Sequence, residues 1–172
     1  TAAGNVAVGL KALKDNTANN NVAVGTSALE NNTTGTGNIA IGYEALLTAT
    51  ELDQNTAIGY EALKVMSGSA GDSKNTAVGY QAGLTMTTGT QNTLIGTSAG
   101  DAITTGAYNT AVGTSALSSI TTGTNNVVIG RAAASSLGSS ESGNTVIGTS
   151  AMQAMDADNE TVDNNIAIGL NA

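Results

Sequence analysis

A five-residue motif recurs ten times along the 172 residues of this chain. It consists of Asn, one variable residue, then Ala, Val or Leu, then Val or Ile, and finally Gly. Successive motifs begin 16 to 21 residues apart, at Asn5, Asn21, Asn38, Asn55, Asn75, Asn92, Asn109, Asn126, Asn144 and Asn165. A short period of this kind indicates a stack of similar structural units, each of which contacts only its neighbours.

A second position is fixed relative to each motif. An alanine stands seven residues after every motif Asn, from Ala12 in the first repeat to Ala172 in the last. The residues between one fixed part and the next vary in number and are rich in Thr, Ser, Asn and Gly, which favour loops. We therefore expect loops of variable length to project from one side of a regular stack.

The motif predicts a short strand followed by a turn. Its β-branched residues favour extended backbone, and five residues are too few for a stable helix. Neither Asn-Gly nor Asp-Gly, the pairs that favour tight hairpins, occurs in the chain. The predicted fold is all-β: one domain over residues 1–172 that forms a parallel β-solenoid of about ten coils, with one or two short strands per coil.

Stacking gives each motif position a structural role. Asn above Asn predicts a ladder of side-chain hydrogen bonds, and the motif Gly is expected where a side chain would not fit. These glycines are Gly9, Gly25, Gly42, Gly59, Gly79, Gly96, Gly113, Gly130, Gly148 and Gly169. Because alternate residues of a strand point to opposite faces, both faces of this strand are largely apolar. One coil has a single interior, so we expect another subunit to cover the second face.

Composition excludes several functions. The chain has no His and no Cys, which removes the common nucleophile–base pairs and imidazole or thiolate metal sites. A net charge of −8 opposes binding to nucleic acid. No apolar run has the length of a transmembrane helix, so we expect no membrane insertion by this segment. We expect neither an enzyme nor a cofactor.

Four of the motifs carry a resemblance to a known family. The sequences Asn21-Val-Ala-Val-Gly25, Asn38-Ile-Ala-Ile-Gly42, Asn55-Thr-Ala-Ile-Gly59 and Asn165-Ile-Ala-Ile-Gly169 resemble the YadA-like head repeats of trimeric autotransporter adhesins. The longer sequence Asn75-Thr-Ala-Val-Gly-Tyr-Gln-Ala82 is also similar to repeats of bacteriophage tail fibres. The likeness covers essentially the whole chain, although its loops are longer than those of the compact adhesin repeat.

The resemblance implies a left-handed β-roll in which three chains share one axis, and a fibre that binds surfaces. The implied partners are two further copies of the chain and a glycan or protein receptor on a host-cell or bacterial surface. The implied location is extracellular, at the cell surface or on a virion tail. The chain is then a segment of a longer fibre, and the family has no catalytic residues to carry over.

Tyr43, Tyr60 and Tyr80 follow the motif Gly in three consecutive repeats, so stacking predicts a column of aromatic rings. Such a column suits contact with sugar rings; the alternative is that each Tyr only covers a corner of its coil. Glu44 and Glu61 follow two of these tyrosines. They are expected to point into solvent or to share a cation.

Two long loops are candidates for recognition because binding residues concentrate on loops held by rigid scaffolds. The first runs from Lys64 to Lys74, and the second spans residues 153–164 and contains Asp156, Asp158 and Glu160. The acidic cluster does not match known Ca²⁺-binding loops, so the sequence predicts no metal site there. Thr-Thr-Gly triplets, such as the one at Thr87, leave ice binding as a remote alternative function.

Overall fold

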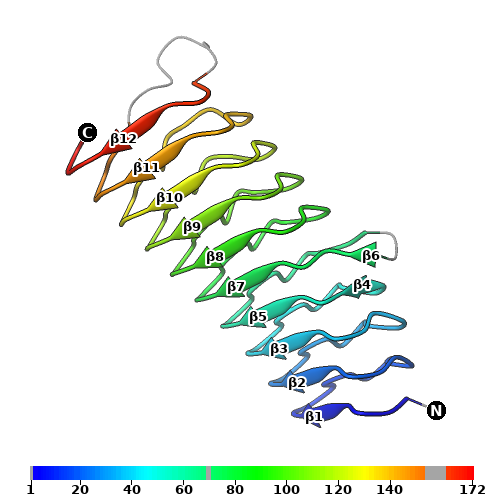
Figure 1. The fold of residues 1–172 in the computed structure, drawn as a ribbon. Coiled ribbons are helices and arrows are strands. Elements are labelled where there is room, and N and C mark those ends of the chain that lie inside the picture. Colours follow the sequence, from blue (N-terminus) through cyan, green and yellow to red (C-terminus); the bar gives the residue numbers. More distant parts are fainter. Residues whose placement is uncertain (1, 69–70, 154–161) are drawn as a thin grey trace.

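The computed structural model describes residues 2–68, 71–153 and 162–172, which form a parallel β-solenoid (Figure 1). Ten strands of three residues each form one sheet: β1 (Val6–Val8), β2 (Val22–Val24), β3 (Ile39–Ile41), β5 (Thr56–Ile58), β7 (Thr76–Val78), β8 (Thr93–Ile95), β9 (Thr110–Val112), β10 (Val127–Ile129), β11 (Thr145–Ile147) and β12 (Ile166–Ile168). A second sheet pairs β4 (Leu52–Asp53) with β6 (Gly71–Asp72). No helix long and apolar enough to cross a bilayer occurs in the described residues.

Every neighbouring pair in the large sheet is parallel and in the register of the sequence motif. Val6, for example, lies opposite Val22, and Thr76 lies opposite Thr93. The predicted parallel solenoid is therefore confirmed, and its ten strands delimit about nine turns. A sharp corner follows each strand, while the loops of different length lie at the opposite edge (Figure 1).

The interior of the solenoid lies between the strand wall and a return wall. The third motif residue points inward, as with Ala57 and Leu94, and is fully buried in the inner turns. The alanine seven residues after the motif Asn, such as Ala62, faces it from the return wall and is also fully buried. Alanine at the second of these positions in every turn, and at the first in most turns, keeps the two walls close together.

The return wall is a succession of turns, so the long sheet takes only one strand from each coil. Its residues six and eight positions after the motif Asn have positive φ although most of them are not glycine, as at Glu44 (φ 53°) and Leu46 (φ 51°). Hydrogen bonds between turns hold this backbone in place: the Leu46 N–H donates to the Ala62 carbonyl at 3.1 Å. This conformation could not be expected from the sequence, because glycine is the usual residue in the left-handed region.

The motif asparagines form the predicted ladder in the buried edge of the strand wall. The Asn92 carboxamide oxygen accepts from the backbone N–H of Asn109 at 3.0 Å and from its Nδ2 at 3.1 Å. The Asn92 Nδ2 also donates to the carbonyl of Gly106 at 2.9 Å. Its Nδ2 donates in addition to the carboxamide oxygen of Asn75 in the preceding turn at 3.1 Å. One side chain thus satisfies polar groups in the turns on both sides of it, as buried polar groups require.

The motif glycines are needed for two reasons at once. Their φ angles lie between 132° and 144°, where other residues are rare. In addition, a Cβ atom on Gly96 would lie 2.6 Å from the carbonyl oxygen of Gly113 in the next turn, closer than real Cβ contacts. The expectation that a side chain would not fit at this position is confirmed.

Candidate functional site

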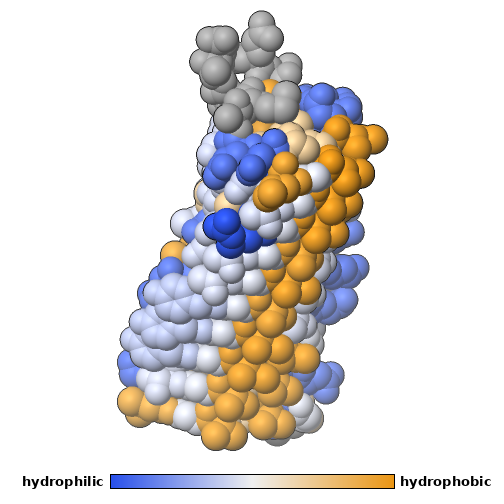
Figure 2. All heavy atoms as spheres, turned by 90° about the vertical axis from the view of Figure 1, so that its left-hand side faces the viewer, coloured by the Kyte–Doolittle hydropathy of each residue, from blue (hydrophilic) through white to orange (hydrophobic). Residues whose placement is uncertain are grey.

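The first candidate surface is an apolar stripe on the outer face of the large sheet. We define it as the aliphatic side chains at the second and fourth motif positions, which point away from the interior. Figure 2 shows a continuous hydrophobic band along the length of the solenoid on this side. The fourth position supplies Val8, Val24, Ile41, Ile58, Val78, Ile95, Val112, Ile129, Ile147 and Ile168, and the second supplies Val6, Val22, Ile39, Val127 and Ile166.

Side chains of the stripe are exposed to solvent in the single chain, even in the inner turns of the solenoid. Ile41 is 37% exposed, and Ile95 and Ile129 are each 40% exposed. These side chains lie in the middle of a regular sheet, so their exposure is not an effect of the chain ends. Contiguous apolar surface on this scale marks an interaction site in soluble proteins.

The predicted tyrosine column is present at the corner after the strands. The Tyr43 and Tyr60 ring centroids are 5.0 Å apart, and those of Tyr60 and Tyr80 are 5.3 Å apart, with planes within 15° of parallel. Stacking covers both faces of Tyr60, so only the outer faces of Tyr43 and Tyr80 are not covered by another ring. The column therefore offers ring edges and hydroxyl groups along its length, and sugar stacking is limited to its two ends at most.

The expectation that Glu44 and Glu61 point into solvent was wrong, because the ammonium group of Lys64 lies between them and is the cation that they share. Its Nζ is 2.7 Å from Glu44 Oε2 and 2.7 Å from Glu61 Oε1, and the two carboxylates have only 19% and 14% of their side chains exposed. Gln81 Nε2 donates to the other oxygen of Glu61 at 2.7 Å. The sequence predicts Lys64 as a ligand-binding residue. In the structure its ammonium group is paired with two carboxylates of the same chain, Glu44 and Glu61.

Electrostatics in this cluster follow from these contacts. Hydrogen bonds from Lys64 lower the pKa of Glu44 and of Glu61, and the same contacts raise the pKa of Lys64. Hydrogen bonding to the Glu44 carboxylate raises the pKa of Tyr43. The cluster is charged at neutral pH and joins three successive turns, so its described contacts indicate a structural role.

The two long loops have different outcomes. Lys74 is exposed at the end of the first loop, and its backbone N–H donates to the carbonyl of Asp53 at 3.4 Å. Asp156, Asp158 and Glu160 lie outside the described residues, so the acidic cluster of the second loop stays a prediction. Among the residues that the structure describes, no group of three or more acidic side chains is placed to hold a metal ion.

The first threonine of each Thr-Thr-Gly triplet is engaged inside the stack. Thr33 donates its hydroxyl to the carbonyl of Thr50 at 3.0 Å, and Thr87 donates to that of Thr104 at 3.1 Å. Thr104 and Thr121 donate in the same way to the turn that follows each of them. These hydroxyls serve contacts between turns, which weighs against an ice-binding array built from the triplets.

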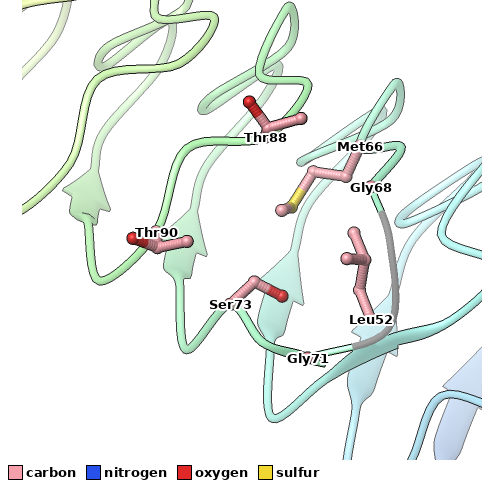
Figure 3. A pocket seen from close by; sticks show the side chains of 7 residues that line it. All are labelled: Leu52, Met66, Gly68, Gly71, Ser73, Thr88 and Thr90. Carbon is pink, nitrogen blue, oxygen red and sulfur yellow. The ribbon is translucent and has the colours of Figure 1, made fainter.

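A cavity of about 330 Å³ opens on the loop edge beside the fourth turn, which we define as residues 55–74. It is lined by Leu52, Met66, Gly68, Gly71, Ser73, Thr88 and Thr90 (Figure 3). Sequence reasoning selected this loop for its length but did not identify the lining residues, because they come from three different turns. The only available signal was the 20-residue spacing between Asn55 and Asn75.

Comparisons with protein-family models, with curated proteins and with solved structures find no match to this chain. The stripe, the column and the cavity are therefore the features of the molecule that bear on its function.

Proposed function

We propose that this chain is a structural and adhesive fibre module of a bacterial trimeric surface adhesin. In this proposal three copies pack side by side through the apolar stripe, outside the cell, as a left-handed β-roll. The observation that carries it is the stripe itself, which continues through the inner turns of a rigid sheet. A fully buried Val or Ile is worth about 1.5–3 kcal/mol, so covering the stripe stabilises an otherwise thin solenoid considerably.

The rest of the surface supports a fibre role over catalysis. The chain contains no His or Cys, and the best-defined charged cluster, around Lys64, is satisfied by its own contacts. Repetition of one short unit gives length and stiffness, and three copies would present every loop three times. Weak individual contacts then add up to firm attachment.

The mass of the purified chain in solution tests the assembly, with three copies expected. Ile58→Asp and Ile147→Asp each place a charge in the stripe and are expected to yield monomers, since an unpaired buried charge is strongly unfavourable. Thr105→Asp is the matched control, because Thr105 is exposed on the loop edge and lies off the stripe. A folded monomer of the unmodified chain at micromolar concentration would contradict the proposal.

Attachment is tested separately with beads that carry the assembled chain. We expect them to adhere to host or bacterial cells, and labelling of the producing cells to place the chain on their surface. Assembly without attachment would reduce the function to that of a spacer. Recovery of the chain with virions would assign it to a bacteriophage tail fibre instead.

A further inference from the structure

The column of second motif residues on the outer face of the large sheet changes character along the solenoid. The fourth motif position is Val or Ile in every motif, whereas the second is aliphatic in five motifs and threonine in the other five. Four of these threonines follow one another on the adjacent strands β5, β7, β8 and β9 (Figure 1), and the fifth is on β11. We name them the stripe threonines: Thr56, Thr76, Thr93, Thr110 and Thr145.

The stripe threonines have hydroxyl groups that no other group of the chain engages. Threonines on the loop edge use theirs inside the stack, since Thr87 and Thr104 each donate to a carbonyl of the next turn at 3.1 Å. Within the described residues, by contrast, no hydrogen bond joins a stripe threonine hydroxyl to another group. These side chains are half-buried on the outer face of the sheet, so their hydroxyls face solvent in the single chain.

Covering the stripe with another copy removes water from these hydroxyls. A hydroxyl buried against an aliphatic surface loses its hydrogen bonds, which is unfavourable. A hydroxyl is both a donor and an acceptor, so a threonine that meets the same threonine of other copies can donate to one neighbour and accept from another. Identical hydroxyls at one level therefore satisfy one another, whether two or three copies meet there.

Only one axial offset between parallel copies gives this match at every level. With no offset, each second-position residue meets its own equivalent in the other copy. A shift by one turn opposes a threonine and an aliphatic residue at four levels: Ile39 with Thr56, Thr110 with Val127, Val127 with Thr145, and Thr145 with Ile166. The fourth motif position cannot distinguish these offsets, because it is aliphatic throughout.

We propose that the stripe threonines set the axial register between copies of this chain, each by contact with the same threonine of a neighbouring copy. The partner is a second copy of the chain, and the inference rests on the association through the stripe proposed above. The aliphatic residues of the stripe drive association, and the threonines select the offset at which copies pack. Zero offset also brings equivalent loops of all copies to the same level of the fibre.

Disulfide formation between copies tests the register, because the chain itself contains no cysteine. Val22→Cys and Ile39→Cys place single cysteines at second positions of neighbouring strands, which lie opposite each other in the sheet. The two variants are refolded together and oxidised, and the linked pairs are identified by mass. A disulfide needs Cα atoms about 4.4–6.8 Å apart, and one turn displaces a residue by about 4.8 Å, so each offset favours a different pair.

We expect disulfides between copies with the same substitution to exceed mixed disulfides at least about tenfold. Adding T56V/T76V/T93V/T110V/T145V makes the second column aliphatic throughout, so copies should still associate and the two kinds of disulfide should become comparable in amount. The matched control is T34V/T88V/T105V/T122V, which changes exposed loop-edge threonines off the stripe and should keep the original ratio.

The outcomes separate this inference from the proposed function. Comparable amounts of the two disulfides with the stripe threonines in place, an unchanged ratio in the fivefold variant, or disulfides of neither kind from an associated chain each overturn the register inference and leave association intact. A monomeric chain overturns both proposals, and the mass of the chain in solution shows this before any disulfide is formed.

Discussion

The fourth turn and the three turns after it share one wall of the solenoid and differ in the other. The later turns begin at Asn75, Asn92 and Asn109 and have 17 residues each, whereas the fourth, from Asn55, has 20. Strand pairing is identical in both regions, with Thr56 opposite Thr76 and Thr76 opposite Thr93. On the loop edge the 17-residue turns pack tightly, while the fourth turn leaves a cavity.

This difference shows where the repeat is specified and where it is free to vary. The strand wall is fixed by side chains that contact the next turn directly, namely the motif Asn and Gly. The loop edge tolerates insertion because a hydroxyl can replace the carbonyl that normally accepts from the Asn amide. A long loop therefore changes the surface of the loop edge without disturbing the strand pairing of the stack.

Alanine substitutions at two glycines, one in the strand wall and one at the cavity, test this contrast. The first is expected to have the largest effect on the free energy of unfolding. Gly96→Ala introduces a Cβ that lies 2.6 Å from the Gly113 carbonyl oxygen, at a φ of 135°. Backbone strain and displacement of the next turn together predict a loss of about 2–6 kcal/mol in the free energy of unfolding. Urea denaturation followed by circular dichroism measures the loss, and failure to fold is the extreme of the same effect.

Gly68→Ala is the matched substitution at the cavity. Its Cβ would lie 3.2 Å from Leu52 Cδ2, the end of a side chain that has room to move. We expect a change of less than about 1 kcal/mol, typical of a substitution away from tight packing. Equal losses for the two alanine variants would show that the strand wall and the loop edge are equally constrained.

Replacing two motif asparagines is expected to have the next largest effect on the free energy of unfolding. Asn92→Ala removes the partners of the Asn109 N–H and of the Gly106 carbonyl, both inside the stack, and predicts a loss of about 2–4 kcal/mol. Asn55→Ala leaves the Asn75 N–H without its acceptor, but the Ser73 hydroxyl retains the carbonyl of Asp53 as a partner. We expect a loss smaller by about 1 kcal/mol, measured by the same denaturation. A larger loss for Asn55→Ala would contradict the idea that the fourth turn adapts.

The strand wall was predictable from sequence because its contacts are between identical residues. Stacking places motif Asn on motif Asn and Gly on Gly, so the ladder and the close approach follow from periodicity alone. The same reasoning placed Tyr60 between Tyr43 and Tyr80. Only the ring spacing, and hence the loss of free ring faces, required coordinates.

Contacts between unlike positions could not be predicted in this way. Lys64 reaches Glu44 in the preceding turn, although these residues occupy different places in the repeat. The cavity likewise depends on how far the additional residues move the loop, which no spacing specifies. The positive φ at Glu44 is set by the return wall as a whole, since each turn bonds to its neighbours.

The ion pairs of Lys64 with Glu44 and Glu61 occur in the fourth turn and not in the turns after it. Removing them is expected to have the smallest effect on the free energy of unfolding. The position of Lys64 is occupied by Leu84 in the next turn, so Lys64→Leu makes the fourth turn resemble its neighbour. Pairing with Lys64 lowers the pKa of Glu44 and Glu61 from the ordinary value of 4.5, so ionised carboxylates favour the folded state. This contribution is present above pH 4.5 and is lost as the pH falls through the lower folded-state values.

The free energy of unfolding of Lys64→Leu should therefore be lower than that of the unmodified chain by about 1 kcal/mol or less at pH 7, and the difference should shrink at pH 3. Urea denaturation at the two pH values measures it, and NMR titration should show the pKa of both carboxylates raised in the variant. The double variant E44Q/K64L serves as the control, because with one carboxylate gone the pH dependence left by the unpaired charges should be weaker. A difference between Lys64→Leu and the unmodified chain that stays constant or grows on acidification would mean that Lys64 does not lower the pKa of the two carboxylates. The fourth turn would then be held by its β4–β6 pairing and its loop contacts, without help from the ion pairs.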